Sequence, residues 1–477
     1  MTKLAFCALM ALAIPALTAA PPTYNKDIAP ILNTQCALCH RPGEVAPFSL
    51  LNYQDAAKRA ALIANVTQKR LMPPWKPEAG FGKFQHERRL SDDQIALLGA
   101  WAKAGAPEGD PADKLPAPSF AAGWQGGEPT AVFKTGHGFN VPADGPDLYQ
   151  CFVIPLNNEQ ESYIQTAEFR PGNPSVVHHG IIYVDESGGG RKLAANSPDG
   201  SYSCFGGPRV NAALVDGWAP GTLIPPGDPQ LSIPVKKGAD LIVQLHYHPS
   251  GKPETDISTV GITYSGPPSK GRLTYIVSDE DIDIAPGDSH YVVRHSLRLT
   301  HDVQLSTIYP HAHWLGKDLK IDARFPNGET SHLVWIKDWD FNWQGGYRYE
   351  TPVQLPKGTL IELQYTYDNS GKNPHNPSNP PIPVKYGEQT NDEMAVALLT
   401  LVLPSPADVA PFRRDTRLGI IEDIIAGNDY TGLRGRIPGY NAARTDQLVK
   451  QYDKNGDGKL DTEEGAALME FIRGLIK

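Results

Sequence analysis

The sequence lacks three features, and each absence narrows what the protein can be. After residue 20, no segment approaches the ~18 uninterrupted apolar residues that a membrane-spanning helix needs, so no membrane span is expected in the mature chain. No long block of Lys and Arg appears and the net charge is −9, which argues against nucleic acid as a partner. Neither a Ser-His-Asp set nor a pair of acidic residues stands out as hydrolytic machinery. The chemistry must therefore be sought in histidine, methionine and the few cysteines.

The first 20 residues have the layout of a secretory signal peptide. Lys3 precedes an apolar run from Leu4 to about Leu17, and small residues follow at Thr18 to Ala20. The run is too short for a comfortable membrane span, so we predict a signal that is cleaved on export; an uncleaved anchor is the alternative. The mature protein is then expected in the periplasm or outside the cell.

Composition and pattern predict several domains. A chain of 477 residues is long enough for about three of them. Glycine and proline are plentiful, short strand-like segments alternate with turns, and helical periodicity is confined to the two ends. We predict a small all-α domain, two antiparallel, jelly-roll-like β-sandwiches and a short α-helical EF-hand. The expected boundaries are a signal peptide at 1–20, a haem domain at 21–110, a linker at 111–130, sandwiches at 131–275 and 276–405, a connector at 406–440 and a calcium-binding segment at 441–477.

A haem-attachment motif opens the mature chain. Cys36-x-x-Cys39-His40 is the signature of a c-type haem, in which two thioethers hold the porphyrin and the histidine supplies an axial nitrogen. A redox dithiol and half of a zinc site are the alternatives. No second Cys pair follows, and no thioredoxin-like pattern surrounds the motif. We predict haem c.

The opposite face of the haem needs a second ligand. Met72 lies in KRLMPPWKP, where two prolines fix the following backbone, and a thioether there suits electron transfer. His86 is the competing ligand. An amphipathic helix capped by Ser91 is expected next. Residues 23–109 thus resemble a small single-haem cytochrome c domain.

The two remaining cysteines, Cys151 and Cys204, lie in strand-like surroundings. An exported protein sees an oxidising compartment, so we predict a structural disulfide between them.

Histidine doublets mark the predicted β-region. Residues two apart in a strand point to the same face, whereas adjacent residues point to opposite faces and can share a metal only where the backbone bulges. Imidazole donors without a carboxylate cluster favour copper or zinc, and the soft thioether of Met394 favours copper. We predict two copper ions. The doublets are His178 with His179, His246 with His248, and His311 with His313.

These motifs stand in the order VVHHG, LIVQLHYHPSG followed by VGITY, IYPHAHWLGK and NDEMAV. Over residues 131–405 the chain resembles the copper type II, ascorbate-dependent monooxygenases, the family of dopamine beta-monooxygenase and the peptidylglycine hydroxylating enzyme. The resemblance implies an electron-transfer copper at His178, His179 and His246, and an oxygen-binding, catalytic copper at His311, His313 and Met394. His248 matches no ligand of the family, so we expect it to support the ligands without binding copper itself.

Two departures from the family bear on the substrate. Peptide-amidating members carry an arginine where this chain has Tyr309, and the tyrosine they have shortly after the methionine is missing from residues 395–399. Peptidylglycine is therefore a poor candidate, and a small organic molecule with an activatable C–H bond is expected.

The predicted function is an exported copper-dependent monooxygenase, an oxidoreductase that acts on paired donors and incorporates one oxygen atom of O2. An exported electron donor, a protein or an ascorbate-like reductant, is expected to deliver electrons through the haem. The alternatives are a haem and copper electron-transfer protein that never activates O2, and a calcium-dependent binding module.

The C-terminal stretch DKNGDGKLDTEE fits the twelve-residue calcium loop of an EF-hand, with a glycine, Gly458, at the sharp turn. Helices are expected on both sides of it. The predicted calcium ligands are Asp453, Asn455, Asp457, Lys459 through its backbone carbonyl, Asp461 through water, and Glu464.

Overall fold

The computed structural model describes residues 20–476 except 43, 45, 121, 122, 221, 223, 225, 226 and 388. The predicted signal peptide, including Lys3 and Cys7, lies outside the described residues apart from residue 20. In the described part of the chain, no helix combines the length and the apolar character that a membrane crossing requires. The structure consists mostly of antiparallel β-sheets with a few helices, as the sequence predicts.

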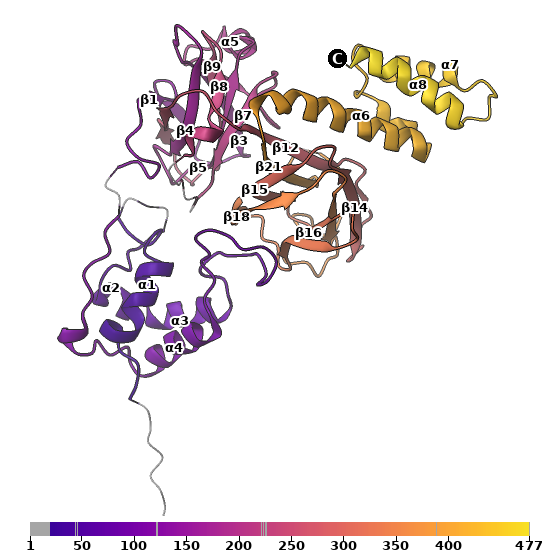
Figure 1. Ribbon diagram of the computed structural model, residues 1–477. Helices are drawn as coiled ribbons and strands as arrows, with labels where there is room; N and C mark the ends of the chain where they lie inside the picture. Colours follow the sequence, from indigo (N-terminus) through magenta and orange to yellow (C-terminus); the bar gives the residue numbers. More distant parts are fainter. Residues whose placement is uncertain are drawn as a thin grey trace, which may run out of the picture. The chain divides into compact units, whose positions relative to one another are not determined.

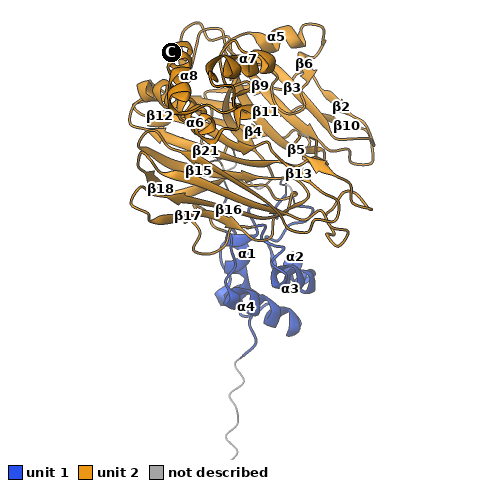
Figure 2. Ribbon diagram, turned by 90° about the vertical axis from the view of Figure 1, so that its right-hand side faces the viewer, with its two compact units in different colours: residues 1–74, 88–120 blue, residues 75–87, 121–477 orange. Residues whose placement is uncertain are grey.

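The chain divides into two compact units (Figure 2). The helical unit comprises residues 1–74 and 88–120, and the β unit comprises residues 75–87 and 121–477. The chain therefore passes from one unit to the other three times.

The helical unit is built on an apolar core in which Leu98 and Trp101 are completely buried. The helix predicted after Ser91 is confirmed: Ser91 and Gln94 form a reciprocal capping box at its start. The elements are the π-helical turn η1 (Tyr24–Ile28), α1 (Ala29–Gln35), α2 (Tyr53–Ala57), α3 (Ala60–Gln68), α4 (Asp92–Lys103) and the 3-10 turn η2 (Pro111–Asp113).

The first half of the β unit contains two larger sheets that share one core. Their strand orders are β1-β11-β4-β8 and β6-β3-β9-β5-β7, and β10 pairs with β2 in a small third sheet. Phe169 and Ile262 come from one larger sheet and Ile182 and Leu245 from the other, and all four are buried in the same cluster. The elements are β1 (Ala131–Lys134), β2 (Phe139–Val141), β3 (Leu148–Pro155), β4 (Ser162–Arg170), β5 (Val177–Asp185), α5 (Gly189–Ala194), β6 (Ser201–Ser203), β7 (Ala213–Trp218), η3 (Pro229–Leu231), β8 (Ile233–Val235), β9 (Asp240–Tyr247), β10 (Glu254–Asp256) and β11 (Thr259–Tyr264).

The second half repeats this plan with the sheets β12-β21-β15-β18 and β14-β19-β16-β17, and β13 pairs with β20. Leu305 and Leu399 from the first sheet pack in one core with Ile321 and Tyr365 from the second. Figure 1 shows the two halves, with β12, β15 and β21 labelled in the second. The strands are β12 (Gly271–Asp279), β13 (Asp283–Ile284), β14 (Tyr291–Arg298), β15 (Val303–His311), β16 (Gly316–Arg324), β17 (Thr330–Ile336), β18 (Tyr347–Leu355), β19 (Leu360–Tyr367), β20 (Val384–Lys385) and β21 (Ala395–Leu403).

The short segment 75–87 is part of the second core although it lies between two parts of the helical unit in sequence. Phe84 is 2% exposed and forms an antiparallel bridge with Tyr349, and the amide of Gln85 donates to the carbonyl of Arg348 at 2.8 Å. The segment thus extends the sheet beside β18.

The predicted disulfide is present: Cys151 of β3 is bonded to Cys204, with 5.7 Å between their Cα atoms. It ties the loop after β6 to the sheet that carries β9 and β5.

The C-terminal helices form a small core of their own. Ile421 and Ile425 of α6 pack there with Leu448 and Leu468 of the two helices around the predicted calcium loop. Phe412, near the start of α6, is buried in the second β core instead. Helix α6 therefore belongs to both cores. The elements are η4 (Pro406–Asp408), α6 (Val409–Gly427), η5 (Tyr430–Leu433), α7 (Ala442–Tyr452) and α8 (Thr462–Leu475).

Candidate metal centres

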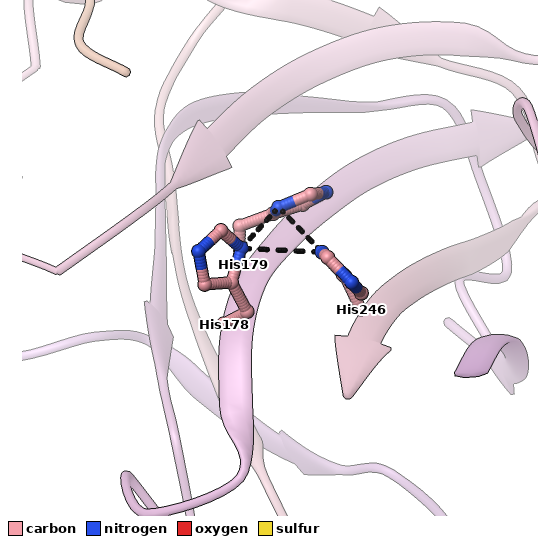
Figure 3. Close-up of side chains that lie close together, drawn as sticks. All are labelled: His178, His179 and His246. Atoms are coloured by element: carbon pink, nitrogen blue, oxygen red, sulfur yellow. Dashed lines mark hydrogen bonds between the residues drawn. The ribbon is translucent and has the colours of Figure 1, made fainter. Parts of the chain in front are cut away.

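Three histidines from two neighbouring strands meet in the first half of the β unit. His178 and His179 lie on β5 and His246 on β9, and their imidazoles point toward one another (Figure 3). The Nδ1 atom of His178 lies 3.3 Å from that of His179 and 3.2 Å from that of His246, and the remaining Nδ1 pair is 3.3 Å apart. Among the described residues, this triad is the set of three or more His, Cys, Asp or Glu side chains whose donor atoms all lie within 4.8 Å of one another, so it could hold a metal ion.

A strand irregularity explains how adjacent histidines can face one point. The pairing of β5 with β9 shifts register between Val177 and His179, so His178 lies at a bulge. His179 is directly opposite His246 across the two strands. The bulge that the sequence requires for a shared site at His178 and His179 is therefore present.

The spacing of the three nitrogens fits a metal ion. The centre of a nearly equilateral triangle with these edges lies about 1.9 Å from each corner, close to the ~2.0–2.1 Å of metal–imidazole bonds. Burial and the neighbouring imidazoles lower the pKa of His178 to about 4 and that of His179 well below its usual value. Both rings are thus neutral at pH 7, the form in which imidazole binds metals.

Asp147 determines which nitrogen of His246 faces the other histidines. Its Oδ2 atom lies 2.6 Å from Nε2 of His246, and an ionised carboxylate can only accept, so Nε2 carries the proton and Nδ1 keeps its lone pair. The other carboxylate oxygen lies 2.7 Å from Nδ1 of His248. His248 therefore stands behind Asp147, where it supports the triad from outside. Tyr149 stacks on His246 with ring centroids 4.4 Å apart.

Sequence reasoning missed Asp147. The residue precedes His246 by 99 positions and belongs to no recognisable motif, and only the pairing of β3 with β9 brings it to the triad. No signal in a single sequence could have found it.

A second pair of imidazoles lies in the other half of the β unit. His311 ends β15, and His313 follows two residues later, with ring centroids 5.1 Å apart and an interplanar angle of 81°. The two rings are neighbours on one side of the chain, as expected for residues two apart in extended backbone.

The hydrogen bonds of this pair leave the Nε2 atoms available. Nδ1 of His313 lies 3.0 Å from the carbonyl of Asp392, which can only accept, so Nδ1 is protonated. Nδ1 of His311 lies 2.6 Å from Oε1 of Gln344, whose amide nitrogen donates to the carbonyl of Phe341. His311 therefore also donates through Nδ1. Burial lowers the pKa of both rings, that of His311 to about 3.

A buried carboxylate connects this pair to the predicted methionine ligand. Glu393 is completely buried and accepts backbone N–H groups from His313 at 2.8 Å, Leu315 at 2.5 Å and Met394 at 3.2 Å. Burial raises the pKa of Glu393 to about 8, while these N–H groups act in the opposite direction. The hydroxyl of Tyr367 donates to the carbonyl of Met394 at 2.7 Å. The backbone of Met394 is thus fixed to the backbone that carries His313.

Gln344 and Glu393 also escaped sequence reasoning. Gln344 lies in an irregular stretch before β18, and Glu393 reads as one more acidic residue beside Met394. Their roles depend on a loop and a strand that meet only in the folded chain.

The two histidine groups lie within electrostatic reach of each other. His311 contributes to the lowered pKa of His179, after the effects of burial and of the other triad members. Charge on one group is therefore felt at the other.

The haem motif in the helical unit has free thiols and one free imidazole nitrogen. Cys36 and Cys39 form no disulfide, and burial raises the pKa of both, that of Cys36 to about 12. Nδ1 of His40 lies 3.1 Å from the carbonyl of Phe48, so it carries the proton and Nε2 is left as the donor atom. These are the donors that a covalent haem requires.

The two candidates for the opposite haem ligand fall in different units. Met72 belongs to the helical unit together with the haem motif, whereas His86 belongs to the β unit. This division favours Met72 as the ligand within one compact unit.

The predicted calcium loop lies between α7 and α8. Glu464 accepts the backbone N–H of Lys454 at 2.7 Å, and Asp453 accepts those of Gly456 and Gly458 at 2.8 and 3.0 Å. Both carboxylates thus already face the loop. The remaining predicted ligands, Asn455, Asp457, Lys459 and Asp461, lie on the same twelve-residue turn.

The chain matches no family model and no curated protein. Solved structures that match the chain include the major capsid protein P2 from bacteriophage PM2, at 8% identity and a TM-score of 0.24, covering 57% of this chain and 97% of that one. A peptide-N(4)-(N-acetyl-beta-D-glucosaminyl) asparagine amidase matches at 13% identity and a TM-score of 0.25, covering 58% and 97%. Likeness at this level carries no conclusion on activity.

Proposed function

We propose that the protein is an exported copper-dependent monooxygenase that hydroxylates a C–H bond of a small organic substrate. The overall reaction is R–H + O2 + 2 electrons + 2 protons → R–OH + water, so an external donor must supply two electrons per turnover. This function follows the resemblance to the copper type II, ascorbate-dependent monooxygenases, and the geometry of the two histidine groups supports it.

The observation that carries the proposal is the contrast in protonation between the two groups. The three Nδ1 atoms of the triad face one another, and their spacing fits one ion. Asp147 keeps the proton of His246 on Nε2, so Nδ1 of His246 turns its lone pair toward the other two rings. His311 and His313 both hold their Nδ1 protons and offer Nε2 instead.

Two coppers, if held at these groups, supply one-electron redox chemistry and the place where O2 reacts. The chain's own residues then have separate tasks. Asp147 keeps His246 in the ligand tautomer, and Glu393 holds His313 and Met394 in register. With two imidazoles and one thioether, the second centre would keep coordination positions open for a reactant, and by the resemblance the triad would hold the electron-transfer copper.

The proposed haem is a built-in entry point for electrons. Cys36, Cys39 and His40 would hold it, with Met72 on the opposite face. Substituting His40 or Met72 should slow oxygenation driven by an exported protein donor and leave copper binding unchanged. Donor-driven turnover at the wild-type rate in both variants would contradict this role.

The C-terminal hand is proposed to bind calcium. Because α6 is shared between the small helical core and the second β core, the ion would serve stability or docking more than signalling. An exported protein meets steady calcium, which fits a permanent structural ion.

The deciding experiment measures the copper-to-haem ratio of protein reconstituted with Cu(II), together with its EPR spectrum. Two magnetically isolated coppers per haem are expected. His311→Ala should remove one of them and His178→Ala the other, while His332→Ala, at an exposed histidine that contacts Asp322, should remove neither.

Three outcomes separate the candidate functions. Copper near zero would overturn the metal sites and leave a binding module attached to a cytochrome. Two coppers without O2 consumption by the reduced protein, across a substrate screen, would favour the alternative of a non-oxygenating electron-transfer protein. Two coppers with substrate-dependent O2 consumption would support the monooxygenase.

A further inference from the structure

The sheet that carries His311 has a second face, turned away from its core, and its side chains can be ordered from the strand register. Here "outer face" means this side of β12-β21-β15-β18. The residues that alternate with the buried ones point to it. Tyr309 pairs with Leu398, and Leu398 with Ile276, so these three form one row across the sheet. We call them the apolar row. Ile276 is 58% exposed, so at β12 the row is open to solvent.

The apolar row lies between His311 and a charged end of the same face. Along β15 the outer face presents His311, then Tyr309, then Thr307, and Thr307 pairs with Arg348 of β18. Thr307 lies four positions before His311 on β15, which corresponds to a distance of roughly 13 Å along the strand. Thr307 pairs with Thr400 of β21, and Thr400 pairs with Thr274 of β12, so these three residues form one row across the sheet. Arg272 is the next outward-facing residue of β12 beyond this row and therefore lies at the same end of the face. The two arginines thus rise from the two edge strands of one sheet.

Both arginines act on a single carboxylate. Burial raises the pKa of Asp216 of β7, and Arg272 and Arg348 act in the opposite direction. Burial lowers the pKa of Arg272, and Arg348 adds to this effect. The two guanidinium groups and the carboxyl group are therefore close enough to interact, and the arginines outnumber the acidic group.

Most hydrogen-bonding capacity of these arginines is unused. A guanidinium has five N–H donors. Arg272 donates to the carbonyl of Val215 at 3.2 Å, and neither Arg272 nor Arg348 forms a side-chain salt bridge with any residue that the structure describes. The hydroxyl of Tyr309 likewise donates to none of the described residues. A partly desolvated cation with free donors beside an apolar surface is suited to bind a carboxylate through paired N–H groups.

We propose that Arg272 and Arg348 form a subsite for the carboxylate group of a monoanionic organic acid, whose apolar body lies across the apolar row toward His311. The inference rests on the proposed function and names its substrate class. It also explains how an acid could be recognised although Tyr309 stands where the peptide-amidating relatives have an arginine.

The test compares two probes of the same shape that differ in charge, 4-phenylbutanoate and 4-phenylbutanamide. Their dissociation constants are measured by calorimetry on the full-length protein, both after EDTA treatment and after copper loading. Wild-type protein should prefer the carboxylate at least tenfold. Arg272→Met and Arg348→Met should each remove that preference and leave the amide within twofold, and Asp216→Asn should strengthen carboxylate binding.

Controls keep each result decisive. Arg298→Met, on β14 of the other sheet, should behave as wild type. If Arg272→Met loses its cooperative unfolding transition, the exposed Arg348 and the conservative Arg272→Lys decide the matter. Equal affinity for both probes in wild-type protein, no binding of either probe, or a preference that survives Arg348→Met overturns the subsite. A normal preference in protein that takes up no copper would overturn the proposed function alone.

Discussion

The two histidine groups of the β unit differ in the atoms they offer and in how those atoms are held. The triad presents three Nδ1 atoms from paired strands, and a carboxylate behind His246 fixes its tautomer. His311 and His313 present Nε2 atoms from the end of a strand and the loop after it, held by a side-chain amide and a backbone carbonyl. The difference shows that an imidazole can present either ring nitrogen to a metal ion, depending on which nitrogen a hydrogen-bond partner occupies.

Removing a triad ligand should have the largest effect and leave the other group intact. His179→Ala deletes one of three nitrogens, so copper affinity there should fall by more than the roughly 100-fold that loss of a supporting group costs. Substrate-dependent O2 consumption should fall as well, because the proposed electron-transfer copper at the triad would no longer be present to supply the second electron. Copper stoichiometry and turnover check this. A variant that keeps both coppers would contradict the contrast between the sites.

Removing Glu393 should destabilise the second site and the fold around it. Glu393→Ala leaves three buried N–H groups without an acceptor, and we expect a loss of roughly 3–5 kcal/mol in the free energy of unfolding. Urea denaturation measures it. Glu362→Gln, at an exposed ion pair with Arg324, is the matched control and should cost at most about 1 kcal/mol. Similar losses in both variants would rule out the organising role of Glu393.

Removing the carboxylate of Asp147 should weaken copper binding at the triad and not at the second histidine group. Asp147→Asn removes the carboxylate that receives the Nε2 proton of His246, and copper affinity at the triad should drop roughly 10–100-fold while the second site is unaffected. Competition with a copper chelator, followed by EPR, resolves the two sites. Asp144→Asn, three residues earlier and exposed, should leave both affinities unchanged.

Acidification should destabilise the metal-free protein through both groups. The folded pKa values of His178 and His311, about 4 and about 3, lie below the usual 6.5, so the unfolded chain binds more protons as the pH falls. Stability is therefore complete above pH 6.5 and declines from there toward pH 4, by at most about 2 kcal/mol for each histidine at pH 5. Urea midpoints at pH 7.5 and 5 should differ less in His178→Gln than in wild type. An equal difference would mean that burial of His178 does not disfavour its charge.

Calcium should have the smallest effect, and it should not change copper binding at either histidine group. Wild-type protein should unfold at a higher temperature in excess calcium, by up to roughly 2.7 kcal/mol of added stability at a hundredfold excess over Kd. Glu464→Gln should abolish the shift, and Glu463→Gln, at the neighbouring exposed position, should retain it. A shift that persists in Glu464→Gln would place the calcium elsewhere.

The sequence predicted the antiparallel β-fold, the disulfide and the helix after Ser91, because each depends on local spacing or on one long-range pairing. The resemblance to the copper monooxygenases implied that His178, His179 and His246 converge, since spacing alone did not distinguish His246 from His248. The sequence could not predict Asp147, Gln344 or Glu393. These residues act through hydrogen bonds that form only when loops and strands far apart in the chain come together, and in a single sequence one acidic or amide residue looks like any other. The identity of the metals stays a prediction, since donor geometry alone does not distinguish copper from zinc.

Segment 75–87 has a consequence for how such a protein can be shortened or recombined. Because Phe84 is buried in the β unit, a truncated chain that starts at residue 121 will not be an intact β unit: it loses a strand-like edge and uncovers Tyr349. The two units are interlaced along the chain and not joined end to end. Exchanging the helical unit for another domain would require three coordinated cuts along the chain, so a fusion at a single junction would not replace it.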